Sequence, residues 1–166
     1  FNLLGPVTNP AGVVNQLLGV YSKDWVRPMA EVLKNLGSEH VLVVHSADGL
    51  DEISIAKETY VAELRNGEIT EYTITPEQFG MTRASLDSLT VSGAAESLVI
   101  VNALLAGEKG PAADIVALNA GAALYAANVV DSLELGIKAA QDVLNSGKGL
   151  EKLHELVALT RAMKEG

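Results

Sequence analysis

The chain has 166 residues, which fits a single domain with a hydrophobic core of its own. Its formal net charge of −9 argues against nucleic acid or an anionic membrane as a partner, and the lack of cysteine excludes disulfides and thiolate metal sites. Hydrophobic residues make up 48% of the sequence but aromatic residues only 4%, so small aliphatic side chains dominate, as in helices packed closely against a sheet. No signal peptide is visible, and we expect a cytoplasmic protein.

The first half of the chain alternates between loops, strands and one helix. Residues 1–12 contain two prolines, two glycines and two asparagines, which predict an extended entry followed by a loop. Residues 15–21 predict a short buried strand, and a helix follows that begins near Pro28 and ends before Gly37. Residues 40–45 form a continuous apolar run, typical of a strand of a parallel sheet that is buried on both faces.

The second half begins with a hairpin and continues as helices. Residues 59–64 and 68–74 alternate between apolar and polar side chains around Asn66-Gly67, the kind of dipeptide that most strongly indicates a tight hairpin. The most apolar stretch, residues 115–130, is too short to span a membrane and predicts a buried helix. Helices are expected over residues 94–106, 112–127, 132–145 and 149–163.

The order of these elements predicts the α/β class. A strand, a helix, a second strand, a hairpin and then helices are typical of a sheet covered by helices. The chain starts with Phe1 rather than methionine, in the middle of a patterned segment. We therefore expect residues 1–166 to be a single α/β domain fragment, with further strands of the sheet in a missing N-terminal part.

Asp51 and Glu52 are the strongest candidates for a functional site. They follow Gly49-Leu50, just beyond the carboxyl end of the predicted strand at 40–45, where ligands bind in open α/β sheets. Adjacent carboxylates on a loop can converge on one ion, and Mg²⁺ is commonly held by one or two carboxylates with water and phosphate oxygens. A solvated acidic turn is the alternative, and spacing alone does not exclude it.

Gly5 and Pro6 are a second candidate, for binding rather than chemistry. A rigid loop with small side chains lets a flat ligand approach the backbone closely. A plain connecting turn is the alternative that this pattern leaves open.

The remaining polar residues give no catalytic candidate. His45 ends a buried strand, where a hydrogen-bonded core histidine is expected. Ser46, Asp48 and Asp51 supply the other residue types of a catalytic triad, but triad partners usually come from distant segments rather than one short run. The sequence has neither a dinucleotide-binding glycine motif nor a phosphate-binding P-loop.

Three segments together resemble one enzyme family. The segments FNLLGPVTNPAG, VLVVHSADGLDEIS and VALNAGAALYAA occur in the order found in the anthranilate phosphoribosyltransferases. LGPxTNP and DGLDE are the most specific of these motifs. The family usually has glycine after the strand histidine, where this chain has Ser46, a small change that we expect to be tolerated.

The resemblance implies a fold and a reaction. The fold is part of the large α/β domain of the nucleoside phosphorylase and phosphoribosyltransferase type, with a central, mostly parallel sheet, a hairpin and flanking helices, and with the N-terminal helical domain absent. The reaction transfers the phosphoribosyl group of phosphoribosyl pyrophosphate to anthranilate in tryptophan biosynthesis. The family is usually a homodimer.

The resemblance also assigns roles to the two candidate pairs. Asp51 and Glu52 would help to hold Mg²⁺ on the diphosphate, and Gly5 and Pro6 would line the anthranilate path. The phosphate-binding loop and an arginine that contacts anthranilate would lie before Phe1. We therefore expect the missing N-terminal half to be a partner and this chain alone to be inactive.

Two other functions remain open at this point. One is a pyrimidine nucleoside phosphorylase relative, which the residues of the LGPxTNP and DGLDE motifs disfavour. The other is a non-catalytic binding module of the same fold, for example for nucleic acid, which the acidic charge and the retained Asp51-Glu52 pair disfavour.

Overall fold

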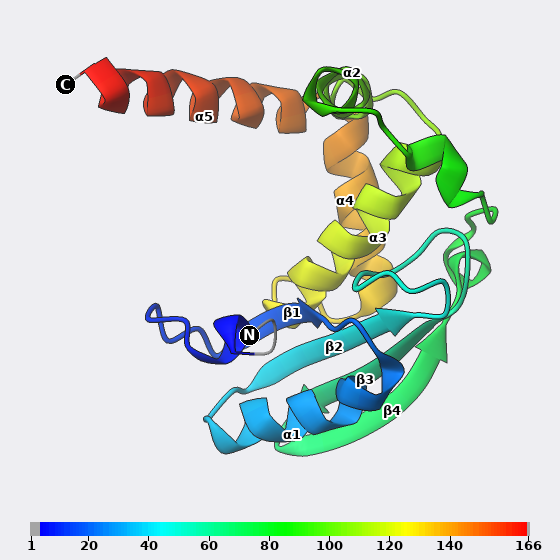
Figure 1. Cartoon of the computed structure of the whole chain (residues 1–166), viewed down its shortest axis with the longest axis vertical. Helices are drawn as coiled ribbons and strands as arrows, with labels where there is room; N and C mark the ends of the chain where they lie inside the picture. Colours follow the sequence, from blue (N-terminus) through cyan, green and yellow to red (C-terminus); the bar gives the residue numbers. More distant parts are fainter. Residues whose placement is uncertain (1–3, 166) are drawn as a thin grey trace.

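Helices cover both faces of a four-stranded sheet in the computed structural model, which describes residues 4–165 (Figure 1). The strands lie side by side in chain order. They are β1 (Asn15–Gly19), β2 (His40–Ser46), β3 (Thr59–Arg65) and β4 (Glu68–Ile74).

The sheet is mixed rather than mostly parallel within the described residues. β1 and β2 are parallel, whereas β2 with β3 and β3 with β4 are antiparallel. The predicted hairpin accounts for the second antiparallel pair, because Asn66 and Gly67 have φ angles of 53° and 78° and reverse the chain in two residues. A parallel connection needs a crossover, which a helix supplies between β1 and β2 but not between β2 and β3.

That crossover helix is α1 (Val26–Asn35), which covers one face of the sheet. Pro28 occupies its third position, where a missing backbone N–H costs no hydrogen bond. Val41 and Val43 of β2 pack on the α1 side, and Leu42 and Val44 pack in the core on the opposite side. The prediction that this strand is buried on both faces is confirmed.

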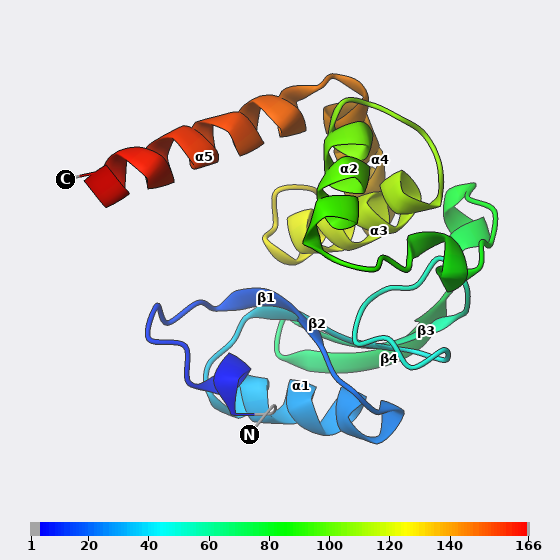
Figure 2. The same ribbon diagram turned by 45° about the horizontal axis from the view of Figure 1, so that its top comes forward.

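The other helices lie on the opposite side of the sheet (Figure 2). Their bounds agree with the expected ranges to within two residues. Gly121 and Gly136 let two of them cross closely, since a Cβ at Gly121 would lie 2.4 Å from the Ile137 backbone. The four helices are α2 (Ala94–Leu105), α3 (Pro111–Ala126), α4 (Leu133–Asn145) and α5 (Lys148–Glu165).

Three expectations need correction. Gly5–Val7 forms a 3₁₀ turn instead of an extended segment, and β1 ends at Gly19 instead of at residue 21. The apolar helix α3 is not fully buried, because Val116 and Ala120 are exposed. Within residues 4–165, none of the helices has the length and hydropathy to cross a membrane.

Candidate metal and substrate site

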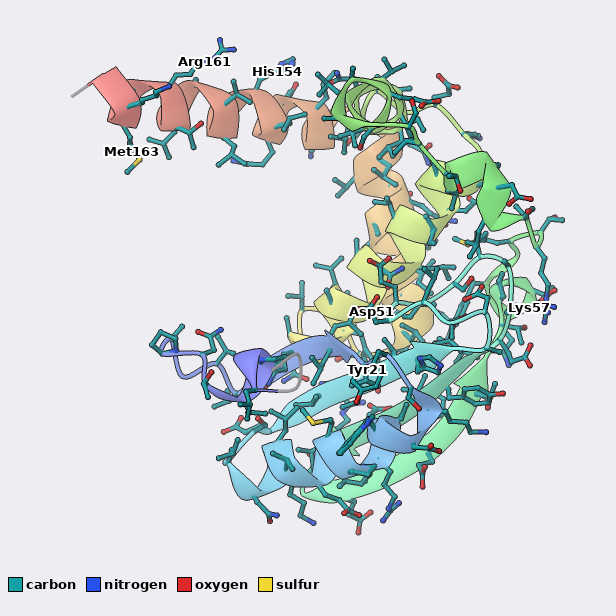
Figure 3. The ribbon with its side chains drawn as sticks, viewed as in Figure 1. Tyr21, Asp51, Lys57, His154, Arg161 and Met163 are labelled. Atoms are coloured by element: carbon teal, nitrogen blue, oxygen red, sulfur yellow. The ribbon has the colours of Figure 1, made fainter. Side chains whose placement is uncertain are left out.

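Asp51 and Glu52 lie on the loop between β2 and β3. Figure 3 shows Asp51 at the sheet end where β1 and β2 finish. Both side chains are exposed. The residues that follow are buried in the core, and Ile53 and Ile55 are only 2% and 0% exposed. The fold therefore presents two carboxylates to solvent on a backbone that is anchored immediately after them.

Asp48 stabilises the beginning of the same loop. Its carboxylate accepts hydrogen bonds from the Ser54 hydroxyl and from the Leu50 amide. Burial alone would raise the pKa of this carboxyl, but hydrogen bonds from Ser54, Ser46 and the Leu50 amide together hold the pKa below its usual value. Asp48 is thus kept ionised and holds the loop together from within.

Two further contacts fix the loop from outside. The carbonyl of Asp51 lies against Gly19 at the end of β1. The side chain of Asn119, from α3, pairs with the backbone N–H and C=O of Ile53 at 2.9 and 2.8 Å. Sequence analysis did not identify Asn119, although it stands in one of the three family-like segments.

The donor set around Asp51 and Glu52 fits an open metal site better than a closed one. Across residues 4–165, no group of three or more histidine, cysteine, aspartate or glutamate side chains is placed to hold a metal ion. An ion here would need most of its ligands from water and substrate. That is the ligand set of Mg²⁺ bound to a phosphate-bearing substrate.

Gly5 and Pro6 lie elsewhere. Pro6 lines a pocket of about 200 Å³ between the N-terminal loop and the end of α1, together with Val14 and Leu36. This pocket is at the beginning of β1, whereas Asp51 packs against the end of β1. The described residues therefore do not bring the two candidate pairs together.

His45 is a core residue, as expected. Its Nδ1 is 2.8 Å from the carbonyl oxygen of Val20, so this nitrogen donates the hydrogen bond. The hydroxyl of Ser46 contacts the Glu58 carbonyl oxygen, and Asp48 bonds to Ser54. None of these contacts forms a catalytic triad.

A buried polar cluster centred on Glu63 was missed by sequence analysis. Its carboxylate accepts hydrogen bonds from the hydroxyls of Tyr72 at 2.8 Å and Tyr125 at 2.7 Å, and it lies 3.1 Å from Nε2 of His40. Arg65 donates to the Tyr125 hydroxyl. The available signal was a charged residue, Glu63, between the apolar residues Ala62 and Leu64 of β3. The cluster links α3 to strands β2, β3 and β4, and its histidine lies at the start of β2, away from Asp51.

Residues 1–150 match the glycosyl transferase family, in its a/b domain. The chain belongs to this family. It is 58% identical over 161 residues to an anthranilate phosphoribosyltransferase of Methylococcus capsulatus, and 61% identical over 163 residues to one of Chromohalobacter salexigens. These alignments cover 97% and 98% of this chain but 47% of each relative. The chain thus spans about half the length of these relatives.

Solved structures of the same family agree with the fold. The anthranilate phosphoribosyltransferase of Thermus thermophilus superposes with a TM-score of 0.87 at 46% identity, over 96% of this chain and 47% of that one. The Saccharomyces cerevisiae enzyme in complex with PRPP and Mg superposes with a TM-score of 0.78 at 26% identity, over 91% of this chain and 44% of that one. The expected α/β class is confirmed.

The family motifs of this glycosyl transferase chain meet in space only in part. Asn119, from the VALNAGAALYAA segment, contacts Ile53, from the VLVVHSADGLDEIS segment. The N-terminal segment, which contains Gly5 and Pro6, packs against α1 instead. The contact between Asn119 and Ile53 lies directly after the exposed residues Asp51 and Glu52 in the chain.

Proposed function

We propose that this chain is the C-terminal part of the catalytic α/β domain of an anthranilate phosphoribosyltransferase. The complete protein would transfer the phosphoribosyl group of phosphoribosyl pyrophosphate to the amine of anthranilate, in tryptophan biosynthesis. N-(5-phosphoribosyl)anthranilate and pyrophosphate are the products. Identities of 58% and 61% to proteins of that name support the proposal.

The observation that carries the proposal is the exposed Asp51–Glu52 pair on its anchored loop. We propose that both carboxylates face a Mg²⁺ ion on the substrate diphosphate, as the complex of the yeast relative with PRPP and Mg suggests. When bound, this ion would offset the negative charge that develops on the leaving pyrophosphate. The role of the chain's own residues is to hold two negative charges at a fixed place.

The reaction requires alignment of the two substrates and needs no nucleophilic side chain. The amine of anthranilate attacks the anomeric carbon, the bond to the diphosphate breaks, and the amine loses a proton. Holding the two substrates in alignment makes the attack effectively intramolecular. We propose that Gly5 and Pro6 line the path of anthranilate, since the half-buried ring of Pro6 already borders a pocket.

The proposed partner is the N-terminal half of the complete protein, since this chain covers only 47% of each of these relatives. Helix α5 contacts α2 and α4 and then projects away from the other helices (Figures 1 and 2). Met163 points to the side on which the sheet lies, whereas His154 and Arg161 point away from it (Figure 3). Leu159 and Met163 are 60% and 74% exposed. We propose that the N-terminal half covers this apolar side of α5, and that the complete protein is a cytoplasmic homodimer.

The proposal is tested by assaying the full-length protein for consumption of anthranilate. The expected result is turnover that requires both phosphoribosyl pyrophosphate and Mg²⁺, with none from the present chain alone. A parallel assay offers a pyrimidine nucleoside with phosphate. Phosphorolysis of the nucleoside without consumption of anthranilate would overturn the proposal in favour of a phosphorylase.

A further inference from the structure

We infer that Asn119 is a positioning residue for the Asp51–Glu52 pair. This inference rests on the proposed function, because it explains how the carboxylates of that site are held. Asn119 belongs to α3, and its side chain contacts the backbone directly after Glu52.

The contact uses both hydrogen-bonding groups of the carboxamide. Oδ1 of Asn119 accepts from the Ile53 N–H at 2.9 Å, and Nδ2 donates to the Ile53 carbonyl oxygen at 2.8 Å. One side chain therefore satisfies the complete backbone unit of one loop residue, much as a neighbouring strand would. Aspartate at this position would keep the acceptor but lose the donor, and alanine would lose both.

The carboxamide is itself held in place. Nδ2 of Asn119 also donates to the Ile115 carbonyl oxygen, one turn earlier in α3, at 3.0 Å. This third bond restrains the side chain in the orientation that faces Ile53. The side chain of Asn119 therefore fixes the loop relative to α3, because it is short and has few accessible conformations.

The backbone that carries the two carboxylates is held at two points. The carbonyl of Asp51, between the two residues, packs on Gly19 of β1, and directly after Glu52, Ile53 is bound to Asn119 and buried in the core. A loop held at two points loses little conformational entropy when it binds an ion. Release of the second point would let Glu52 move relative to Asp51 and weaken the shared site.

The test measures metal affinity directly in the full-length protein, with Mn²⁺ as the probe and pyrophosphate present. Binding is followed by electron paramagnetic resonance of free Mn²⁺. We expect Asn119→Ala and Asn119→Asp to weaken Mn²⁺ binding by about 10- to 100-fold, the usual effect of losing a residue that orients metal ligands. Binding of an anthranilate analogue should stay within about twofold, because Asn119 acts only through the metal loop.

Asn128 provides the matched control. It also links the α3 end of the molecule to the sheet, with its Oδ1 2.7 Å from Nδ1 of His40 at the start of β2. Asn128→Asp adds the same negative charge as Asn119→Asp but keeps its hydrogen-bond acceptor for His40, so we expect it to leave Mn²⁺ affinity unchanged. Asn119→Asp keeps the acceptor for the Ile53 N–H and carries the test if Asn119→Ala does not fold.

The outcomes separate this inference from the proposed function. Unchanged Mn²⁺ affinity in the Asn119 variants, or equal weakening in Asn128→Asp, would overturn the positioning role. The variant Asp51→Asn with Glu52→Gln is measured in the same series. If that variant also binds Mn²⁺ normally, the proposed metal site is wrong. If Mn²⁺ binding is weakened in that variant but not in the Asn119 variants, the metal site stands and only the role of Asn119 is wrong.

Discussion

The carbonyl oxygen of Asp51 occupies the space that a side chain at Gly19 would need. A Cβ built on Gly19 would lie 1.5 Å from that oxygen and 2.5 Å from the carbonyl carbon. Gly19 does not adopt a left-handed φ, so space rather than backbone conformation requires glycine here. The end of β1 thus serves as the support on which the loop of Asp51 and Glu52 rests.

Gly19→Ala should therefore displace the loop. We expect a loss of about 1–3 kcal/mol in the free energy of unfolding, typical of overpacking against atoms that cannot move aside. Turnover of the full-length enzyme should also require more Mg²⁺. Urea denaturation and a magnesium titration measure the two effects. Gly93→Ala is the control, since a Cβ there meets nothing within 4 Å. Equal stability of both variants would contradict the steric argument.

Removing both charges of the proposed metal pair should lower turnover strongly. Asp51→Asn with Glu52→Gln keeps the shape of the side chains, and we expect a loss of about 10²–10³-fold, the scale of losing one key electrostatic stabiliser. Anthranilate binding should change little. Steady-state kinetics of the full-length double variant across a magnesium titration provides the measurement. Near-normal turnover with an unchanged magnesium dependence would mean that Asp51 and Glu52 form a solvated acidic turn.

Pro6→Ala should affect one substrate more than the other. If the ring borders the anthranilate path, its loss removes one or two methylene contacts at ~0.8 kcal/mol each, and the KM for anthranilate should rise roughly fourfold to fifteenfold. The KM for phosphoribosyl pyrophosphate should stay nearly constant, because Pro6 and Asp51 lie at opposite ends of β1. Equal rises in both constants, with lower thermal stability, would indicate a purely structural loop.

The buried cluster around Glu63 predicts a loss of stability in alkali. Burial and the nearby Glu63 carboxylate raise the pKa of Tyr72 well above its ordinary value. Above pH ~10 the unfolded chain releases this proton while the folded chain keeps it, so the free energy of unfolding falls by up to about 1.4 kcal/mol per pH unit for this group. Below that pH its contribution is fully present.

Tyr72→Phe should reduce this alkaline slope. At neutral pH it should also cost about 1–3 kcal/mol, because Glu63 loses a hydrogen bond while it stays largely buried. Urea denaturation at several pH values between 7 and 11 gives both quantities. Tyr21→Phe, at an exposed tyrosine, is the control. The same slope in the wild type and in Tyr72→Phe would rule out this source of pH dependence.

The proposed interface on α5 can be tested with one added charge on either side of the helix. Met163→Lys should weaken binding of the separately produced N-terminal half by about tenfold or more, since burial of an unpaired charge costs at least ~1.4 kcal/mol. His154→Lys adds a charge on the side that points away from the sheet (Figure 3) and should have little effect. Isothermal titration calorimetry compares the two variants. Equal affinities would place the contact elsewhere.

The sequence by itself determined most of the local structure. Asn66-Gly67 predicts the hairpin because its two residues accept the positive φ angles of a tight turn. The apolar run of β2 predicts a strand covered on both faces, and the helix bounds follow from prolines, glycines and periodic apolar residues. These signals are local, since each depends on residues a few positions apart. Asp51 and Glu52 could be identified as candidate metal ligands in the same way, from their place just after a predicted strand.

Only the tertiary structure decided how those carboxylates are held. Asn119 is 66 positions from Ile53, and nothing in the spacing of either segment indicates that they touch. The need for glycine at position 19 likewise appears only when the loop after β2 is packed on the end of β1. The mixed sheet and the Glu63 cluster also depend on pairing between distant segments. Such contacts are set by how helices and strands pack, because packing, unlike turn formation, satisfies groups that are far apart in the chain.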